Sequence, residues 1–375
     1  MAKYRALTAA DMNKSKKVWT KKKIVAASIL GVAVIAFIVG MIIAAVNGFG
    51  RIRAIKSSDE EAAVVGSVAG YEVRYEELRY ITLLHKSALD SAMGKYETLS
   101  DTAKVEYRAA LEREVLHDIE NNYVVLSLCD KYGIDTDSRE VKKEVDDAIE
   151  VFVETELGGM KEYKVWLAEN HLTDAFMRLV YRVDVLEEKL VAYMAENKIG
   201  IEYDNVENAD FTDYVMSSGD FVQTTHTYYP TDWKYADGRT AAQKAADAAK
   251  ELSMVDGDEE RYAAMRSAIG KAPFVSGISM TGDGVYFTYG QMGDFYESVA
   301  FELDLYETSD VVESEDGYYV IMRLPLEREY VARHASELLT QYKYAALYKA
   351  CDEQREQISF TPNEYFGTLK LIDIQ

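Results

Sequence analysis

The chain has 375 residues, 48% hydrophobic and 11% aromatic, a composition that fits a globular protein of two or three domains without large disordered stretches. Its 64 acidic and 42 basic residues give a formal net charge of −22, which excludes DNA or RNA as a general partner, because phosphate binding needs a basic face. The two cysteines, Cys129 and Cys351, are too few for a disulfide framework or a cysteine-rich metal site, and their apolar helical surroundings predict buried thiols.

An uncharged apolar run at residues 24–46 predicts a transmembrane anchor. At about 1.5 Å per residue, a helix of this length crosses the roughly 30 Å hydrocarbon layer. Residues 1–23 carry eight basic residues and one acidic residue, so this tail is expected in the cytoplasm and the rest of the chain outside. A cleaved signal peptide is the alternative, but its apolar core is shorter and no A-x-A site follows at the right place. We therefore expect a single-pass protein of the cell membrane.

A polar stalk at residues 47–63 leads into a helical region, which we place at residues 64–218. Valines on both sides of Ala69-Gly70 predict a short hairpin, and a helix is expected from about Glu76.

Apolar residues recur at helical spacing through residues 102–198. Gly133 is expected to end one helix, Ser138 and Thr173 to cap the starts of later ones, and Gly158-Gly159 to break the chain between them. This pattern is typical of a helical bundle. The five histidines are scattered and form no H-E-x-x-H motif, so we expect no metal and no cofactor.

Residues 219–326 have a different pattern. The segment FVQTTHTYY predicts a strand, two helical segments follow, and the aromatic-rich stretch GVYFTYGQMGDFYESVAFEL precedes a strand-like GYYVIMRL. The expected order is β-α-α-(α)-β, a small α/β domain. Residues 327–375 are expected to return as a helix and a terminal strand within ISFTPNEYFGTLKLIDI, packing on the helical region. The predicted class for the whole chain is α+β.

Three of these segments resemble a parvulin-type peptidyl-prolyl cis-trans isomerase domain: the strand ending VQTTHTYY, the G-Q-M segment with an aromatic residue four positions after its Met, and the final GYYVI. Upstream, the V-x-G-x-V start, KYGIDTDSREV, the Gly-Gly pair and a Tyr-x-x-Trp-Leu segment resemble the N-terminal chaperone domain of SurA and PrsA foldases. The resemblance covers about residues 62–326.

The resemblance implies a set of site residues. They are His226 and Tyr319 as catalytic residues, and Met292, Tyr296, Phe287 and Phe295 as substrate-binding residues. The chain departs from the family at three places. The second family histidine is Tyr319 here. The usual Cys or Asp has no clear match, the ungapped position being Phe274. The basic loop of some parvulins is absent, because TYYPTDWKY carries only Lys234.

Catalysis of prolyl isomerisation is compatible with such a set. Rotation about a peptide bond has a barrier of about 18–20 kcal/mol, and no covalent step or metal is required to lower it. The twisted amide has less charge separation than the planar forms, so an apolar pocket that grips the proline favours it. The alternative is that all these aromatic side chains form a hydrophobic core.

The sequence thus favours a membrane-anchored extracytoplasmic foldase that acts on newly exported, unfolded polypeptides with X-Pro bonds. Two alternatives remain: a binding module of the same architecture without isomerase activity, and a scaffolding ectodomain without clients.

Overall fold

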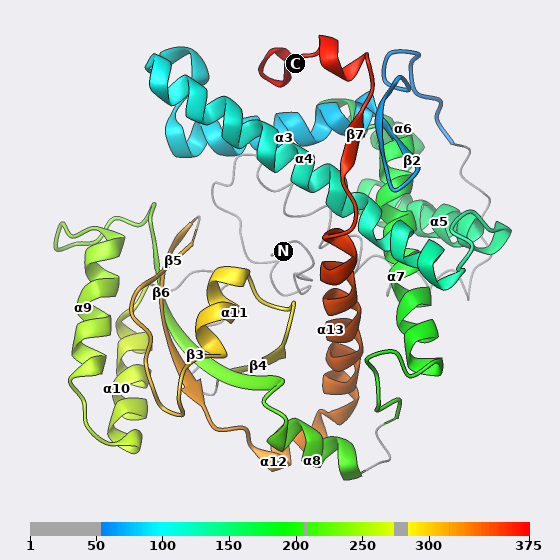
Figure 1. The fold of residues 1–375 in the computed structure, drawn as a ribbon. Coiled ribbons are helices and arrows are strands. Elements are labelled where there is room, and N and C mark those ends of the chain that lie inside the picture. Colours follow the sequence, from blue (N-terminus) through cyan, green and yellow to red (C-terminus); the bar gives the residue numbers. More distant parts are fainter. Residues whose placement is uncertain (1–53, 206–208, 274–283, 315) are drawn as a thin grey trace. The chain divides into compact units, whose positions relative to one another are not determined.

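A computed structural model of the chain describes residues 54–205, 209–273, 284–314 and 316–375 (Figure 1). The predicted anchor at residues 24–46 lies outside these residues. Among the helices that the structure describes, none has the length and apolar character needed to cross a membrane. The described residues form two compact units: a helical unit of residues 54–193 and 350–375, and a sheet unit of residues 194–349.

The helical unit is built from seven main elements and two short turns of other helical types. They are β1 (Val64–Val68), β2 (Tyr71–Arg74), α3 (Tyr75–Met93), a 3-10 turn (Tyr96–Thr98), α4 (Asp101–Tyr132), α5 (Arg139–Phe152), a π-helical turn (Val153–Leu157), α6 (Met160–Glu169) and α7 (Asp174–Glu196). Residues of α13 (Ala335–Arg355) from position 350 onward, and strand β7 (Phe360–Pro362), complete the unit.

The predicted caps and turns of the helical unit are confirmed. Ala69 and Gly70 adopt φ values of 51° and 88°, which close the two-residue hairpin turn between β1 and β2. Gly133 ends α4 in the left-handed region with a φ of 72°. Ser138 Oγ accepts from the Val141 amide, as an N-cap does, and Thr173 Oγ1 does the same for the amide of Phe176.

Strand β7 pairs antiparallel with β1, giving a three-stranded sheet in the order β2-β1-β7 (Figure 1). The terminal strand is much shorter than its sequence suggested: it ends at Pro362, and two 3-10 turns follow, at Phe366–Thr368 and Leu371–Asp373. The end of the chain is nevertheless held on the unit. Lys86 Nζ donates to the carbonyl oxygens of Ile372 and Ile374, at 2.9 and 2.8 Å.

Both cysteines are buried free thiols, as predicted. Gln354 in α13 donates to Ser127 Oγ of α4 at 2.8 Å, which fixes this end of α13 within the helical unit.

Besides Asp174 at its start, α7 buries two carboxylic acids near its middle. Asp184 and Glu187 are only 8% and 7% exposed, and Asp184 Oδ2 has no hydrogen-bond partner among the described residues. Burial, with a smaller effect of Glu188, raises the pKa of Asp184 to about 8. The folded chain therefore holds a proton there that the unfolded chain releases near pH 4.

Stability should respond to this proton. The contribution of protonated Asp184 to the free energy of unfolding is complete below about pH 4 and is lost as the pH rises through about 8. Asp184→Asn should therefore stabilise the helical unit at pH 8, by about 1–3 kcal/mol. Denaturant unfolding at pH 5 and pH 8 measures this, with the exposed Glu169→Gln as the control. An equal effect of Asp184→Asn at both pH values would contradict it.

The sheet unit begins with the end of α7 and then contains the remaining elements. They are α8 (Ala209–Ser217), β3 (Phe221–Pro230), α9 (Ala241–Ser253), α10 (Asp258–Lys271), β4 (Val285–Thr288), α11 (Asp294–Ala300), β5 (Val312–Glu313), β6 (Gly317–Leu324), α12 (Arg328–Arg333) and the first part of α13.

The four strands of this unit run in the order β4-β3-β6-β5, and every pair is antiparallel. Two strands were missed by the sequence analysis. The aromatic stretch opens with strand β4, which pairs with the start of β3, and β5 is only two residues long. Helices α9 and α10 pack on one face of the sheet, while α11 packs on the other (Figure 1).

Candidate functional site

The Gly-Gln-Met turn between β4 and α11 is organised by a buried carboxylate. Glu297, 6% exposed, accepts hydrogen bonds from the backbone amides of Gly290 at 3.0 Å and Met292 at 2.6 Å. Gly290 has a φ of 81°, and a Cβ at this position would meet the ring of Tyr348 in α13. Burial raises the pKa of Glu297, although its backbone donors oppose that shift. The position of Met292 therefore depends on Glu297.

His226 lies on β3 with its ring almost fully covered, at 4% exposure. Its Nδ1 is 2.9 Å from the hydroxyl of Tyr296, and that hydroxyl is also 2.9 Å from Oγ1 of Thr224. Thr224 and His226 are two residues apart on one strand, so both side chains point to the face that carries α11. Tyr296, from α11, reaches down to them and is itself only 1% exposed.

Tyr319 lies on the neighbouring strand β6 and is half-buried. Its ring centroid lies 5.2 Å from that of His226, 5.8 Å from that of Tyr296 and 5.8 Å from that of Phe295. Phe295 is 38% exposed, so this aromatic cluster runs from the buried histidine to the surface of the unit.

Phe287 lies beneath this cluster, at 2% exposure. Its ring meets Tyr296 and Phe301 edge-on, at 5.9 and 5.8 Å. Met292 is half-buried and packs against the same core. Part of the aromatic stretch is therefore hydrophobic core, and part of it lies at the surface.

The structure thus brings the six predicted site residues to one face of the sheet. His226, Tyr296, Tyr319 and Phe295 are in direct contact; Phe287 supports them from the core. Their roles stay predictions. The accessible side chains are Met292, Phe295 and Tyr319, an apolar and aromatic set with one hydroxyl. Such a set is suited to gripping an apolar group and provides no nucleophile.

Two further residues of the site were not singled out from the sequence: Glu297 and Thr224. Their importance comes from contacts between elements that are distant in the sequence. The sequence signal for Glu297 was its place directly after Tyr296 in the G-Q-M segment. Within the described ranges no group of three or more potential metal ligands occurs. Phe274, the ungapped position for the family's Cys or Asp, lies outside the described residues.

Comparison with solved structures finds likenesses of low identity. PrsA from Bacillus anthracis, a peptidylprolyl isomerase, is 16% identical; the match covers 64% of this chain and 95% of that chain, with a TM-score of 0.28. The foldase protein PrsA from Streptococcus pneumoniae is 15% identical, with 79% and 93% covered and a TM-score of 0.28. A Campylobacter jejuni structure from work describing PEB4 and Cj1289 as SurA-like chaperones is 16% identical, with 79% and 98% covered and a TM-score of 0.24. TM-scores this low support no conclusion about the function of this chain.

Comparison with curated protein sequences finds no match. Comparison with protein families does find one: the SurA-like N-terminal domain matches residues 16–191, which include the hairpin, α3 to α6 and most of α7. Residues 16–191 are therefore similar to the SurA-like N-terminal domain family.

Proposed function

We propose that the protein is a membrane-anchored extracytoplasmic foldase, which holds unfolded exported polypeptides and accelerates isomerisation of their X-Pro bonds. The chaperone role is supported by the match of residues 16–191 to the SurA-like N-terminal domain. Apolar grooves of a helical domain are a common mode of binding to polypeptide segments, and the net charge of −22 adds attraction to basic clients.

The isomerase part rests on the sheet unit. Met292, Phe295 and Tyr319 offer an apolar grip for a proline ring, and the buried His226 and Tyr296 offer a hydrogen-bond network beneath it. Rotation needs no covalent intermediate, so preferential binding of the twisted amide is sufficient for catalysis.

A binding module without isomerase activity is the second candidate, and one observation favours it. The hydroxyl of Tyr296 already engages His226, and the residue beside that histidine is Tyr319 rather than a second histidine. In this case the sheet unit only holds the client.

Isomerisation of X-Pro peptides by the full-length chain separates the two candidates. Met292→Ala should lower the rate about tenfold, because losing about 1.4 kcal/mol of transition-state binding has that effect. Tyr319→His should raise a weak activity while the unit stays folded. Met254→Ala, at an exposed methionine of the same unit, is the control and should change nothing. Background rates for both wild type and Tyr319→His, in a folded protein, would leave only the binding module.

The membrane part of the proposal has its own test. The charge bias before residue 24 predicts a cytoplasmic N-terminus, so protease added outside intact cells should digest the chain beyond residue 46. Full protection of the chain in intact cells, with digestion after lysis, would refute this topology.

A further inference from the structure

The helical unit holds a pocket of about 250 Å³ that no part of the proposed chemistry uses. It lies among strand β2, helix α3, helix α4 and the start of α7. Three arginines line it: Arg74, Arg178 and Arg182. They meet at one pocket although acidic residues outnumber basic ones in the chain, 64 to 42.

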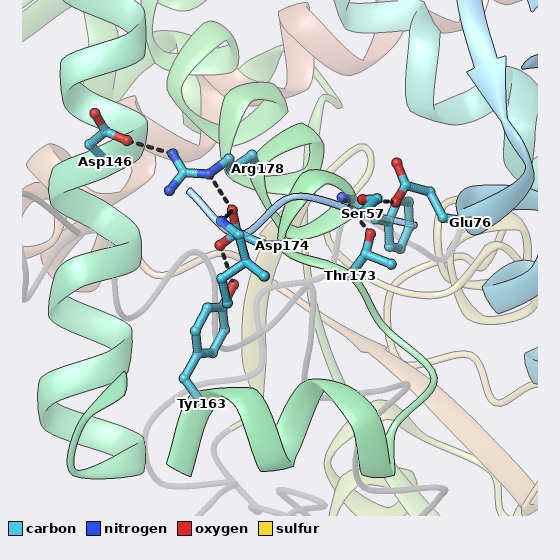
Figure 2. A network of polar contacts seen from close by, with 9 residues as sticks. Ser57, Glu76, Asp146, Tyr163, Thr173, Asp174 and Arg178 are labelled. Atoms are coloured by element: carbon cyan, nitrogen blue, oxygen red, sulfur yellow. Dashed lines mark hydrogen bonds and ion pairs between the residues drawn. The ribbon is translucent and has the colours of Figure 1, made fainter. Parts of the chain in front are cut away.

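Arg178 is held in place by two carboxylates, as Figure 2 shows. Its Nη1 donates to Asp146 of α5 at 2.5 Å, and its Nε donates to Asp174 at 2.7 Å. Its third nitrogen, Nη2, is buried and has no partner within the described residues. A fixed guanidinium with an unused buried donor is prepared to bind an acceptor.

Arg74 and Arg182 add further donors. Arg74 is exposed and Arg182 is half-buried, and within the described part of the chain neither guanidinium forms a hydrogen bond or an ion pair. Each guanidinium carries five N–H donors in a planar fork, the geometry that matches a carboxylate or a phosphate.

The acidic side chains of the pocket are largely occupied. Glu76 accepts from Ser57 Oγ at 2.6 Å (Figure 2). Glu77 accepts from Asn122 at 3.0 Å and from the hydroxyl of Tyr123 at 2.8 Å. Burial raises the pKa of Glu77 to about 7, so this group carries only part of a charge at neutral pH. Glu72, exposed, is the remaining acid. The pocket therefore has unused donors and few unused acceptors.

Its walls are aromatic and its volume is small. Tyr71 and Tyr123 contact each other with ring centroids 6.0 Å apart, and Phe176 lines the pocket as well. Sites for drug-sized ligands usually measure about 300–1,000 Å³. A pocket of this size fits one residue or the end of a chain better than a long segment.

We propose that this pocket binds a carboxylate of a polypeptide, held by Arg74, Arg178 and Arg182, with the residue that carries it packed against the aromatic walls. The C-terminal carboxylate of a chain with an apolar last residue fits best. In such a residue the apolar side chain and the carboxylate are attached to the same Cα atom. An internal Glu or Asp is the other source of the same chemistry. The proposal rests on the proposed function in one respect: the ligand is a client polypeptide.

Binding of three fluorescent nonapeptides to the full-length chain tests this. One ends in a free Phe carboxylate, one is its C-terminal amide, and one is an amide with an internal Glu. We expect the free acid to bind at least about tenfold more tightly than the plain amide. Arg182→Gln and Arg74→Gln should each remove most of that preference without unfolding the chain, because neither arginine has a partner to lose.

Arg113→Gln is the matched control, since it removes the same charge from an exposed side chain of α4 in the same unit. It should leave the preference for the free acid intact.

A different outcome is that the amide with an internal Glu binds tightly and loses that binding in Arg182→Gln. This outcome would support the pocket, with a side-chain carboxylate as its ligand. Equal binding of all three peptides would overturn the pocket and leave the chaperone proposal standing. Binding of inorganic phosphate alone, with no preference among peptides, would also overturn the pocket. Failure of the folded chain to bind any peptide would refute both proposals.

Discussion

Replacing Asp174 by alanine should lower the free energy of unfolding of the helical unit by about 3–5 kcal/mol. The side chain of Asp174 is fully buried, and its two oxygens accept from Tyr163 Oη at 3.1 Å, Arg178 Nε at 2.7 Å and the Ile55 amide at 3.1 Å (Figure 2). The substitution leaves a largely buried guanidinium with only Asp146 as partner, and it orphans a tyrosine hydroxyl. Thermal unfolding should show a midpoint lower by on the order of 10 °C.

Asp146→Ala is the matched comparison. It removes the other carboxylate of the same guanidinium, but its side chain is 27% exposed and water can replace it. We expect a loss of about 1 kcal/mol there. If the two substitutions cost the same, the burial of Asp174 is not what makes this ion pair important.

Substitution of Glu297 by alanine should have the largest effect at the sheet unit. It removes the acceptor of the Gly290 and Met292 amides, and unmade buried hydrogen bonds cost about 1–3 kcal/mol each. The turn loses its shape, so Met292 no longer lies against the aromatic cluster. We expect a loss of about 2–4 kcal/mol in stability and at least about a tenfold loss of X-Pro peptide binding or turnover.

Glu297→Gln is the informative second variant. It keeps one acceptor oxygen but replaces the other with an NH2 group, whose donors cannot bond to the backbone N–H that they face. It should retain the fold and still lose function. Glu302→Gln, at an exposed acid two residues after α11, controls for the change in net charge. Normal peptide binding and turnover by a folded Glu297→Gln protein would show that the turn does not position Met292.

Local features of this fold could be predicted from the sequence because the determining residues are neighbours in the chain. The hairpin depends on Ala69-Gly70, the end of α4 on Gly133 and the start of α7 on Thr173, and each was predicted. Strand β4 was not, because Val285–Thr288 becomes a strand by pairing with Phe221–Thr224, and its own residues also suit a pocket wall or a helix.

The candidate site divides in the same way. Residue types and their order pointed to His226, Met292 and Tyr319, and the fold places these near one another. The bond from Tyr296 to His226 joins positions 70 residues apart, and no spacing in the sequence encodes it. The arginine-lined pocket was not predicted either: Arg74 and Arg182 come from distant elements, and a sequence does not show which charges lack partners.

The sheet of the helical unit has a consequence for how the protein matures. Its first strand, β1, lies near the start of the described chain, and its last, β7, comes almost at the end; the side-chain Nδ2 of Asn363 donates to the Val64 carbonyl across 299 positions. A polypeptide that leaves the ribosome or a translocation channel N-terminus first must wait for this closure. The sheet unit, residues 194–349, is continuous in sequence and needs no later residues. Its folding shortens the free loop that β1 and β7 must close, and so lowers the entropic cost of bringing them together. The part of the protein synthesised first is therefore the part completed last.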